Sequence, residues 1–102
     1  MKRIMVRYKV KPEMAAENRR LVEAVFAAAE TKQLEGVRYA TFVAADGVSF
    51  VHIFSNERSD GSNPLGELDA FKAFQANIRD RCVEPPSATE YEMVGSYRLF
   101  PA

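Results

Sequence analysis

The chain of 102 residues is long enough for one domain and too short for two. Fourteen basic residues balance fourteen acidic ones, which argues against a nucleic-acid-binding protein, because phosphate contacts need an excess of cations on one face. The single cysteine, Cys82, excludes an intramolecular disulfide and an iron–sulfur cluster held by four thiolates. We expect residues 1–102 to form a single domain without a nucleic-acid partner.

The first element is predicted to be a strand over residues 3–10, because apolar and mixed side chains alternate there. Ile4, Val6, Tyr8 and Val10 share one face of it. Its apolar run is too short for a signal peptide or a membrane span. We therefore expect a soluble, cytoplasmic protein that does not bind a membrane.

A helix is predicted from Pro12 to about Gln33, where strong helix formers carry one apolar stripe with three- and four-residue spacing. Proline is tolerated at a first helical position, and Gly36 is a plausible stop after the helix. The stripe consists of Met14, Leu21, Val25, Phe26 and Ala29.

Residues 37–44 and 48–55 read as two strands of a hairpin around Asp46-Gly47, a dipeptide that favours a type I′ turn. With these two residues as the turn, the register follows. On one face Ala45 pairs with Val48, Val43 with Phe50, Thr41 with His52 and Tyr39 with Phe54, while the other face pairs Phe42 with Val51 and Ala40 with Ile53.

The C-terminal third is predicted to hold a polar, mobile loop over 56–64, a helix from Leu65 to about Cys82, and a strand from Tyr91 to Phe100. On this assignment Cys82 belongs to the apolar stripe of the helix, and the Pro85-Pro86 pair breaks the helix. Tyr91 and Tyr97 would share the core parity of the last strand.

The predicted order is strand, helix, strand, strand, helix, strand. Two right-handed crossovers around a hairpin give a ferredoxin-like α+β sandwich, with one antiparallel sheet of order 4-1-3-2 and both helices on the same face. The other face of the sheet is also apolar, with Ala40, Phe42, Val51 and Ile53, and Met5 and Val94 beside them. A contiguous apolar patch favours a homodimer joined through this face. The alternative is a monomer whose tail or loop covers the patch.

The chain resembles the antibiotic-biosynthesis-monooxygenase-like group of the dimeric α/β-barrel superfamily. The resemblance lies in the βαββαβ order, in residues 36–39 and 50–54 of the hairpin, and in residues 70–74 of the second helix. It implies a dimeric α/β barrel with a pocket between sheet and helices in each subunit. Known members include cofactor-independent oxygenases of quinol-like aromatics and haem-degrading enzymes that use an Asn, a Trp and a His. This chain has no Trp, and Ala70 stands where many quinol-oxygenase-like members have a His.

His52 is the only histidine and the candidate catalytic residue. Histidine titrates near neutral pH, so on a cavity wall it could act as the general base that makes an electron-rich phenolate able to react with oxygen. The alternative is a buried neutral His52 that only makes a hydrogen bond to Thr41 or to a backbone carbonyl.

The candidate substrate-binding residues are aromatic: Tyr8, Tyr39, Phe50, Phe54 and Phe71. Phenol groups can orient an aromatic ligand, although tyrosine is also an ordinary core residue. One His and one Cys do not make a metal site, and no cofactor is expected. The hypothesis is thus a small-molecule pocket protein, and specifically a cofactor-independent monooxygenase of a phenolic or quinol-like substrate. The alternative is a non-catalytic ligand-binding or structural homodimer of the same fold.

Overall fold

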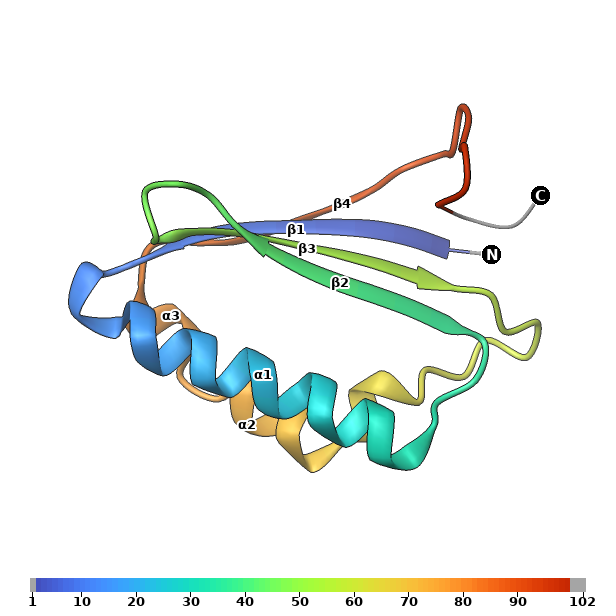
Figure 1. Ribbon diagram of the computed structural model, residues 1–102, viewed down its shortest axis with the longest axis horizontal. Coiled ribbons are helices and arrows are strands. Elements are labelled where there is room, and N and C mark those ends of the chain that lie inside the picture. Colours follow the sequence, from blue (N-terminus) through green and yellow to red (C-terminus); the bar gives the residue numbers. More distant parts are fainter. Residues whose placement is uncertain (1, 100–102) are drawn as a thin grey trace.

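The computed structural model describes residues 2–99 and contains a four-stranded antiparallel sheet with helices on one side (Figure 1). The strands are β1 (Lys2–Val10), β2 (Val37–Val43), β3 (Ser49–Asn56) and β4 (Cys82–Glu90), in the order β2-β3-β1-β4. The helical segments are η1 (Pro12–Met14), α1 (Ala15–Lys32), η2 (Leu65–Glu67), α2 (Asp69–Gln75) and α3 (Ile78–Arg81). The predicted ferredoxin-like fold and its sheet order are confirmed.

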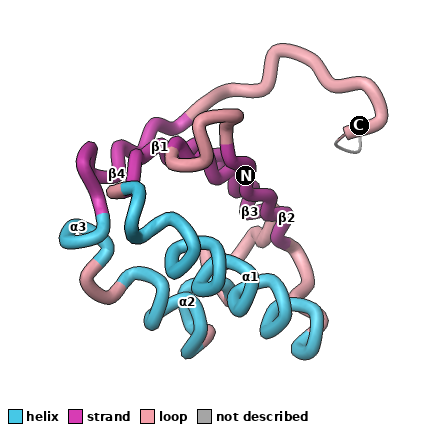
Figure 2. Tube along the Cα trace, turned by 60° about the vertical axis from the view of Figure 1, so that its left-hand side comes forward, coloured by secondary structure: helices cyan, strands magenta, loops and turns pink. Residues whose placement is uncertain are grey.

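The helices and the sheet form two layers, which Figure 2 shows from the side. The core between them is built from the alternating residues of β1 and β3 and from the apolar stripe of α1. Its buried apolar members are Tyr8, Val10, Val22, Val25, Phe50, Leu65, Leu68 and Phe74. No helix within residues 2–99 is long and apolar enough to cross a membrane.

The hairpin has the predicted register but not the predicted turn. Val43 pairs with Phe50, Thr41 with His52 and Tyr39 with Phe54. The strands end at Val43 and Ser49, so the predicted pair of Ala45 with Val48 lies in the loop, where Gly47 alone has a positive φ. A type I′ turn needs two such residues. The Asp46 carboxylate instead accepts hydrogen bonds from the amides of Val48 and Ser49, which closes a longer loop.

The predicted helix over 65–82 is wrong as one element, because it is broken into η2, α2 and α3. Leu68 is extended, and Asn77 has a left-handed φ of 60°, a conformation that asparagine tolerates. At the end of α2, the Arg81 guanidinium donates to the carbonyls of Phe74 and Ala76. Helical spacing persists across the breaks, so the sequence pattern did not reveal them.

The predicted last strand, Tyr91 to Phe100, is also wrong: β4 spans Cys82–Glu90, and Phe100 lies outside the described residues. Prolines are tolerated there because β4 is an edge strand, and its register with β1 shifts where Pro85 and Pro86 lie. Cys82 therefore begins a strand and packs half-buried against the core, while Tyr91 and Tyr97 are exposed.

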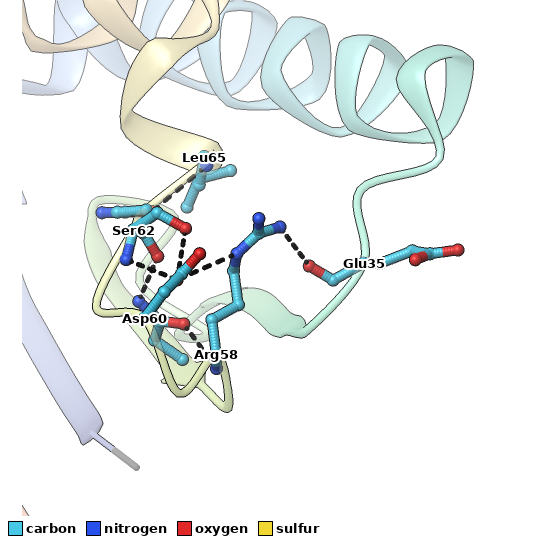
Figure 3. Close-up of polar contacts among 7 residues, drawn as sticks. Glu35, Arg58, Asp60, Ser62 and Leu65 are labelled. Carbon is cyan, nitrogen blue, oxygen red and sulfur yellow. Dashed lines mark hydrogen bonds and ion pairs between the residues drawn. The ribbon is translucent and has the colours of Figure 1, made fainter.

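The loop after β3 is held by its own polar side chains (Figure 3). Asp60 accepts hydrogen bonds from the amide and hydroxyl of Ser62, and its Oδ1 lies 3.7 Å from Nε of Arg58. Arg58 also donates to the backbone carbonyl of Glu35 at 3.1 Å, which fastens the loop to the segment before β2. There Gly36 has a φ of +76°, and a Cβ on it would lie 2.5 Å from Cγ of Arg58.

We expect Gly36→Ala to destabilise the protein more than Gly47→Ala. Both glycines have a φ of +76°, so both variants lose about 1–2 kcal/mol from the left-handed backbone. Only the variant at Gly36 also displaces Arg58, which adds about 1 kcal/mol. Urea denaturation measures both free energies of unfolding, and equal losses would contradict the close contact.

Candidate functional site

A cavity of about 520 Å³ lies between the sheet and the helices α2 and α3. Most of its wall is aromatic or aliphatic, and its polar groups come from a few side chains, which is typical of a small-molecule site. The wall residues from the sheet are Ile4, Val6, Tyr8, Tyr39, His52, Phe54, Pro86 and Ala88, and those from the helical side are Asn63, Leu65, Phe71, Phe74, Gln75, Ile78 and Arg79.

His52 lies in the middle of β3, where both nitrogens of its ring have tyrosine neighbours. The Tyr8 hydroxyl lies 2.7 Å from Nε2, and the Tyr39 hydroxyl lies 2.5 Å from Nδ1. The Thr41 hydroxyl lies 3.0 Å from Nδ1. The strand register places these groups together, because Val6 and Thr41 are the neighbours of His52 in the ladders and the tyrosines lie two residues further along.

The network continues from Tyr8 away from the cavity. Asn18, on the buried side of α1, donates from Nδ2 to the Tyr8 hydroxyl at 2.9 Å. Arg81, at the end of α3, donates from Nε to Oδ1 of Asn18 at 3.2 Å. Asn18 is completely buried and Arg81 is 5% exposed, so a continuous hydrogen-bonded chain runs through the core.

Burial shifts the pKa values of the network toward the neutral forms. It lowers the pKa of His52 from 6.5 to about 4, so the imidazole is neutral at pH 7. Burial raises the pKa of Tyr39 to about 12. It raises the pKa of Tyr8 further, although the hydrogen bond from Asn18 acts to lower it. The resting site therefore has a neutral imidazole between two neutral phenols.

The structure brings most of the sequence-predicted site residues together. Tyr8, Tyr39, His52, Phe54 and Phe71 all line the cavity. Phe50 does not line it. Phe50 is buried in the core, where its ring stacks on that of Tyr8 at a centroid distance of 5.5 Å.

Asn18 and Arg81 were missed by the sequence prediction, although a signal was present. Asn18 falls on the apolar stripe of α1, four residues after Met14 and four before Val22. Arg81 similarly follows Ile78 by three residues. A polar side chain on a buried stripe needs a partner, and that requirement could have marked both residues.

Metal ligands do not gather at this site. Within residues 2–99 no group of three or more His, Cys, Asp or Glu side chains could hold an ion. The polar chemistry available to the cavity wall is that of two phenols, one imidazole, two amides and the guanidinium of Arg79.

The chain shares its fold with several solved structures. One is an antibiotic biosynthesis monooxygenase, with 16% identity, a TM-score of 0.73 and coverage of 93% of this chain and 100% of the other. A protein from Mycobacterium tuberculosis has 17% identity, a TM-score of 0.73 and coverage of 93% and 96%. A protein of unknown function from Nitrosomonas europaea has 17% identity, a TM-score of 0.72 and coverage of 99% and 94%.

At these identities the likeness establishes the fold alone, because unrelated functions recur on one fold. No protein-family model matches the sequence, and a search of curated proteins finds no similar sequence. The ferredoxin-like fold of the single chain, as the resemblance implies it, is thus confirmed.

We expect the free energy of unfolding to fall by about 3 kcal/mol as the pH drops from 6.5 to 4. His52 has a lowered pKa in the folded state, so the unfolded chain binds more protons in this window and is favoured by acid. Urea denaturation at pH 7, 6, 5 and 4 measures the fall.

His52→Gln is the matched control, since His52 is the only histidine and glutamine does not titrate. The lowered pKa values of Asp46 and Asp60 begin to cost stability below about pH 5, as their unfolded forms take up protons, but they do so equally in both proteins. The difference between the two proteins therefore reports His52. The same slope between pH 6.5 and 4 in both proteins would contradict a buried neutral His52.

Proposed function

We propose that the protein binds a phenolic or quinol-like aromatic compound in the 520 Å³ cavity and oxidises it with molecular oxygen, as a cofactor-independent monooxygenase. The observation that carries this proposal is His52, whose two ring nitrogens lie 2.7 Å and 2.5 Å from tyrosine hydroxyls at the cavity wall. These groups can take up and return protons at the wall of a mostly apolar site.

The lining of the cavity supports an aromatic ligand. Phe54, Phe71 and Phe74 line the cavity and offer ring faces and edges to a ligand ring. The ligand hydroxyl would lie at the tyrosines, where it finds the hydrogen-bonding partners that the phenylalanine rings lack.

The proposed reaction needs a base, because an electron-rich phenolate reacts with oxygen more readily than the phenol. The ligand hydroxyl would lose its proton to His52 through a tyrosine hydroxyl, since both imidazole nitrogens are covered by hydroxyl groups. The pKa of about 4 makes His52 a weak base, so the proton transfer would be transient and coupled to oxidation.

The overall reaction is balanced with oxygen as the only co-substrate. A phenol and one O₂ molecule give a para-quinone and one water. The ring carbon opposite the hydroxyl exchanges its hydrogen for one oxygen atom, and the phenolic proton and that hydrogen leave with the second oxygen atom as water. The four electrons gained by O₂ come from the substrate.

A non-catalytic ligand-binding homodimer of the same fold is the second candidate. It is favoured by the occupation of both nitrogens of His52 and by the low pKa of the imidazole, which together describe a satisfied, neutral core histidine. In that case the tyrosine hydroxyls only orient the ligand.

We expect oxygen uptake with a phenolic substrate to fall at least about 100-fold in His52→Gln, because glutamine keeps polarity and removes the base. An oxygen electrode, used to screen the wild-type protein against phenols and hydroquinones, makes the measurement. Lys72→Gln is the control, since Lys72 is exposed on α2 and lies outside the cavity wall. Unchanged turnover in His52→Gln would rule out the base, and ligand binding without any oxygen uptake would favour the second candidate.

We also propose that two copies of the chain pair through the open face of the sheet. In the strand register Ile53 has Met5 on one side and Ala40 on the other, and Val51 is paired with Phe42. These residues lie on the face opposite the core, and Phe42 is 59% exposed. Burying a contiguous apolar patch favours association, and a two-fold pair is its commonest form.

The C-terminal segment does not remove the need for a partner. It follows β4 on the side of the sheet opposite the helices (Figure 1). Val94, Tyr97 and Leu99 on this segment are themselves largely exposed, so they add to the apolar surface. This favours the homodimer over a monomer with a covered face.

We expect Ile53→Lys to convert a dimer to a monomer, because it places a cation at the centre of the proposed interface. Ala27→Lys, on an exposed position of α1, makes the same kind of change away from the sheet and should leave the dimer intact. Size-exclusion chromatography with light scattering measures both masses. A wild-type monomer at micromolar concentration would contradict the proposal.

A further inference from the structure

Arg81 is a buried cation with an unusual set of partners. Its guanidinium donates to the backbone carbonyls of Phe74 and Ala76 at 2.5 Å and 2.9 Å, and to Oδ1 of Asn18 at 3.2 Å. Within the described residues, none of the ion pairs within 4 Å involves Arg81. Buried charges are ordinarily paired, so this one calls for an explanation.

The chemistry of the guanidinium fixes the direction of these hydrogen bonds. A guanidinium can donate hydrogen bonds but cannot accept them, so the atom of Asn18 that faces Arg81 must be the amide oxygen. The amide nitrogen therefore faces Tyr8 and donates to its hydroxyl. Arg81 thus fixes which way round the Asn18 amide lies, a choice that distances alone would leave open.

The direction is passed on to His52. Among the described residues the Tyr8 hydroxyl is hydrogen-bonded to Asn18 and His52 alone, and it already accepts from Asn18. Among the described protein groups its own hydrogen has one acceptor, the Nε2 atom of His52 at 2.7 Å, and a buried donor uses the acceptor within its reach. A neutral imidazole that accepts at Nε2 carries its hydrogen on Nδ1.

The Nδ1 hydrogen then points to the opposite side of the ring. Its nearest acceptor is the Tyr39 hydroxyl oxygen at 2.5 Å, with the Thr41 hydroxyl at 3.0 Å beside it. Since the imidazole supplies the hydrogen of this bond, the hydrogen of Tyr39 itself is not used on His52. Tyr39 can donate it to a molecule in the cavity that it lines.

We infer that Arg81 and Asn18 are positioning residues that fix His52 with its hydrogen on Nδ1, although neither residue lines the cavity. They thereby make the site select aromatic ligands with an acceptor oxygen, which is a phenolate or a ring carbonyl. The ligand preference rests on the proposed function, because it requires an aromatic ligand in this cavity. The assignment of the imidazole hydrogen does not.

The two tyrosines acquire different roles on this inference. Tyr39 donates a hydrogen bond to the ligand oxygen. Tyr8 lies between the cavity and Nε2, the nitrogen that carries the one free lone pair in the plane of the imidazole ring. A ligand proton can therefore reach His52 only through Tyr8. The positive charge of Arg81 lies behind Tyr8 and lowers the pKa of this phenol against the larger effect of burial, which also favours an electron-rich ligand nearby.

Asn18→Asp tests the inference because it reverses the chain with almost no change of shape. Arg81 would donate to one carboxylate oxygen, and the other would accept the Tyr8 hydrogen. The Tyr8 oxygen must then accept from His52, so the imidazole hydrogen moves to Nε2. Nδ1 would accept from the Tyr39 hydroxyl, which lies at 2.5 Å, nearer than the Thr41 hydroxyl at 3.0 Å, and this leaves Tyr39 only lone pairs to offer a ligand.

The readout is ¹⁵N NMR of histidine-labelled protein, which is unambiguous because the chain has one histidine. We expect the hydrogen on Nδ1 in the wild-type protein and on Nε2 in Asn18→Asp. Thr41→Val is the control: it removes the second neighbour of Nδ1, keeps the chain from Arg81 to Tyr8, and should leave the hydrogen on Nδ1. A wild-type hydrogen on Nε2 would overturn the inference without any variant, and so would an unchanged tautomer in folded Asn18→Asp.

The ligand preference is measured with 9-fluorenone and fluorene, which differ by a carbonyl oxygen, using isothermal titration calorimetry. We expect the wild-type protein to bind fluorenone about tenfold more tightly, the worth of one hydrogen bond, and Asn18→Asp to bind the two about equally. Equal binding by the wild-type protein would overturn the preference. Binding of neither compound would count against the proposed function, on which the preference rests, while the tautomer would still decide the role of Arg81 and Asn18.

Discussion

The hydrogen bonds that Tyr8 and Tyr39 make to the two sides of the His52 ring connect the fold to the site. Three strands supply these residues, and through Asn18 and Arg81 the same network reaches α1 and α3. A single chain of polar contacts thus crosses both layers of the molecule. Because each buried donor needs an acceptor, the layers can pack in this way only in one relative position.

The same network explains why a cavity exists beside it. Arg81 binds the last carbonyls of α2, where the helix stops, and Asn77 turns the chain before α3. A continuous helix over 65–82 would lay its apolar stripe along the sheet. The break allows Phe71, Phe74 and Ile78 to surround a space instead of filling it. The apolar packing lost at this cavity is offset by the hydrogen bonds of Arg81. A buried cation costs free energy unless its donors all have acceptors.

The sequence predicted the first half of the fold better than the second, for physical reasons. In β1, β2 and β3 one face is buried, so alternation and the hairpin register determine each other. Apolar and polar residues alternate equally well in the segment from Tyr91. For most of its length, however, this segment has no neighbouring strand to pair with. The strand that does pair contains Pro85 and Pro86, which count against a strand in any pattern and are harmless at an edge with a shifted register.

In the site, too, the residue pattern predicted which side chains lie together but not the hydrogen bonds between their atoms. His52 and its tyrosines could be placed from the register, because alternation decides which side chains share a face. The direction of the hydrogen bonds could not, since it depends on contacts between Asn18 and Arg81, which lie 63 residues apart. Alternation and helical spacing require only a class of side chain at each position, so sequences about 16% identical can keep this fold. The direction of the network instead requires a donor-only group at 81 and an amide at 18, and a chain with the same fold but other groups there would direct these hydrogen bonds differently.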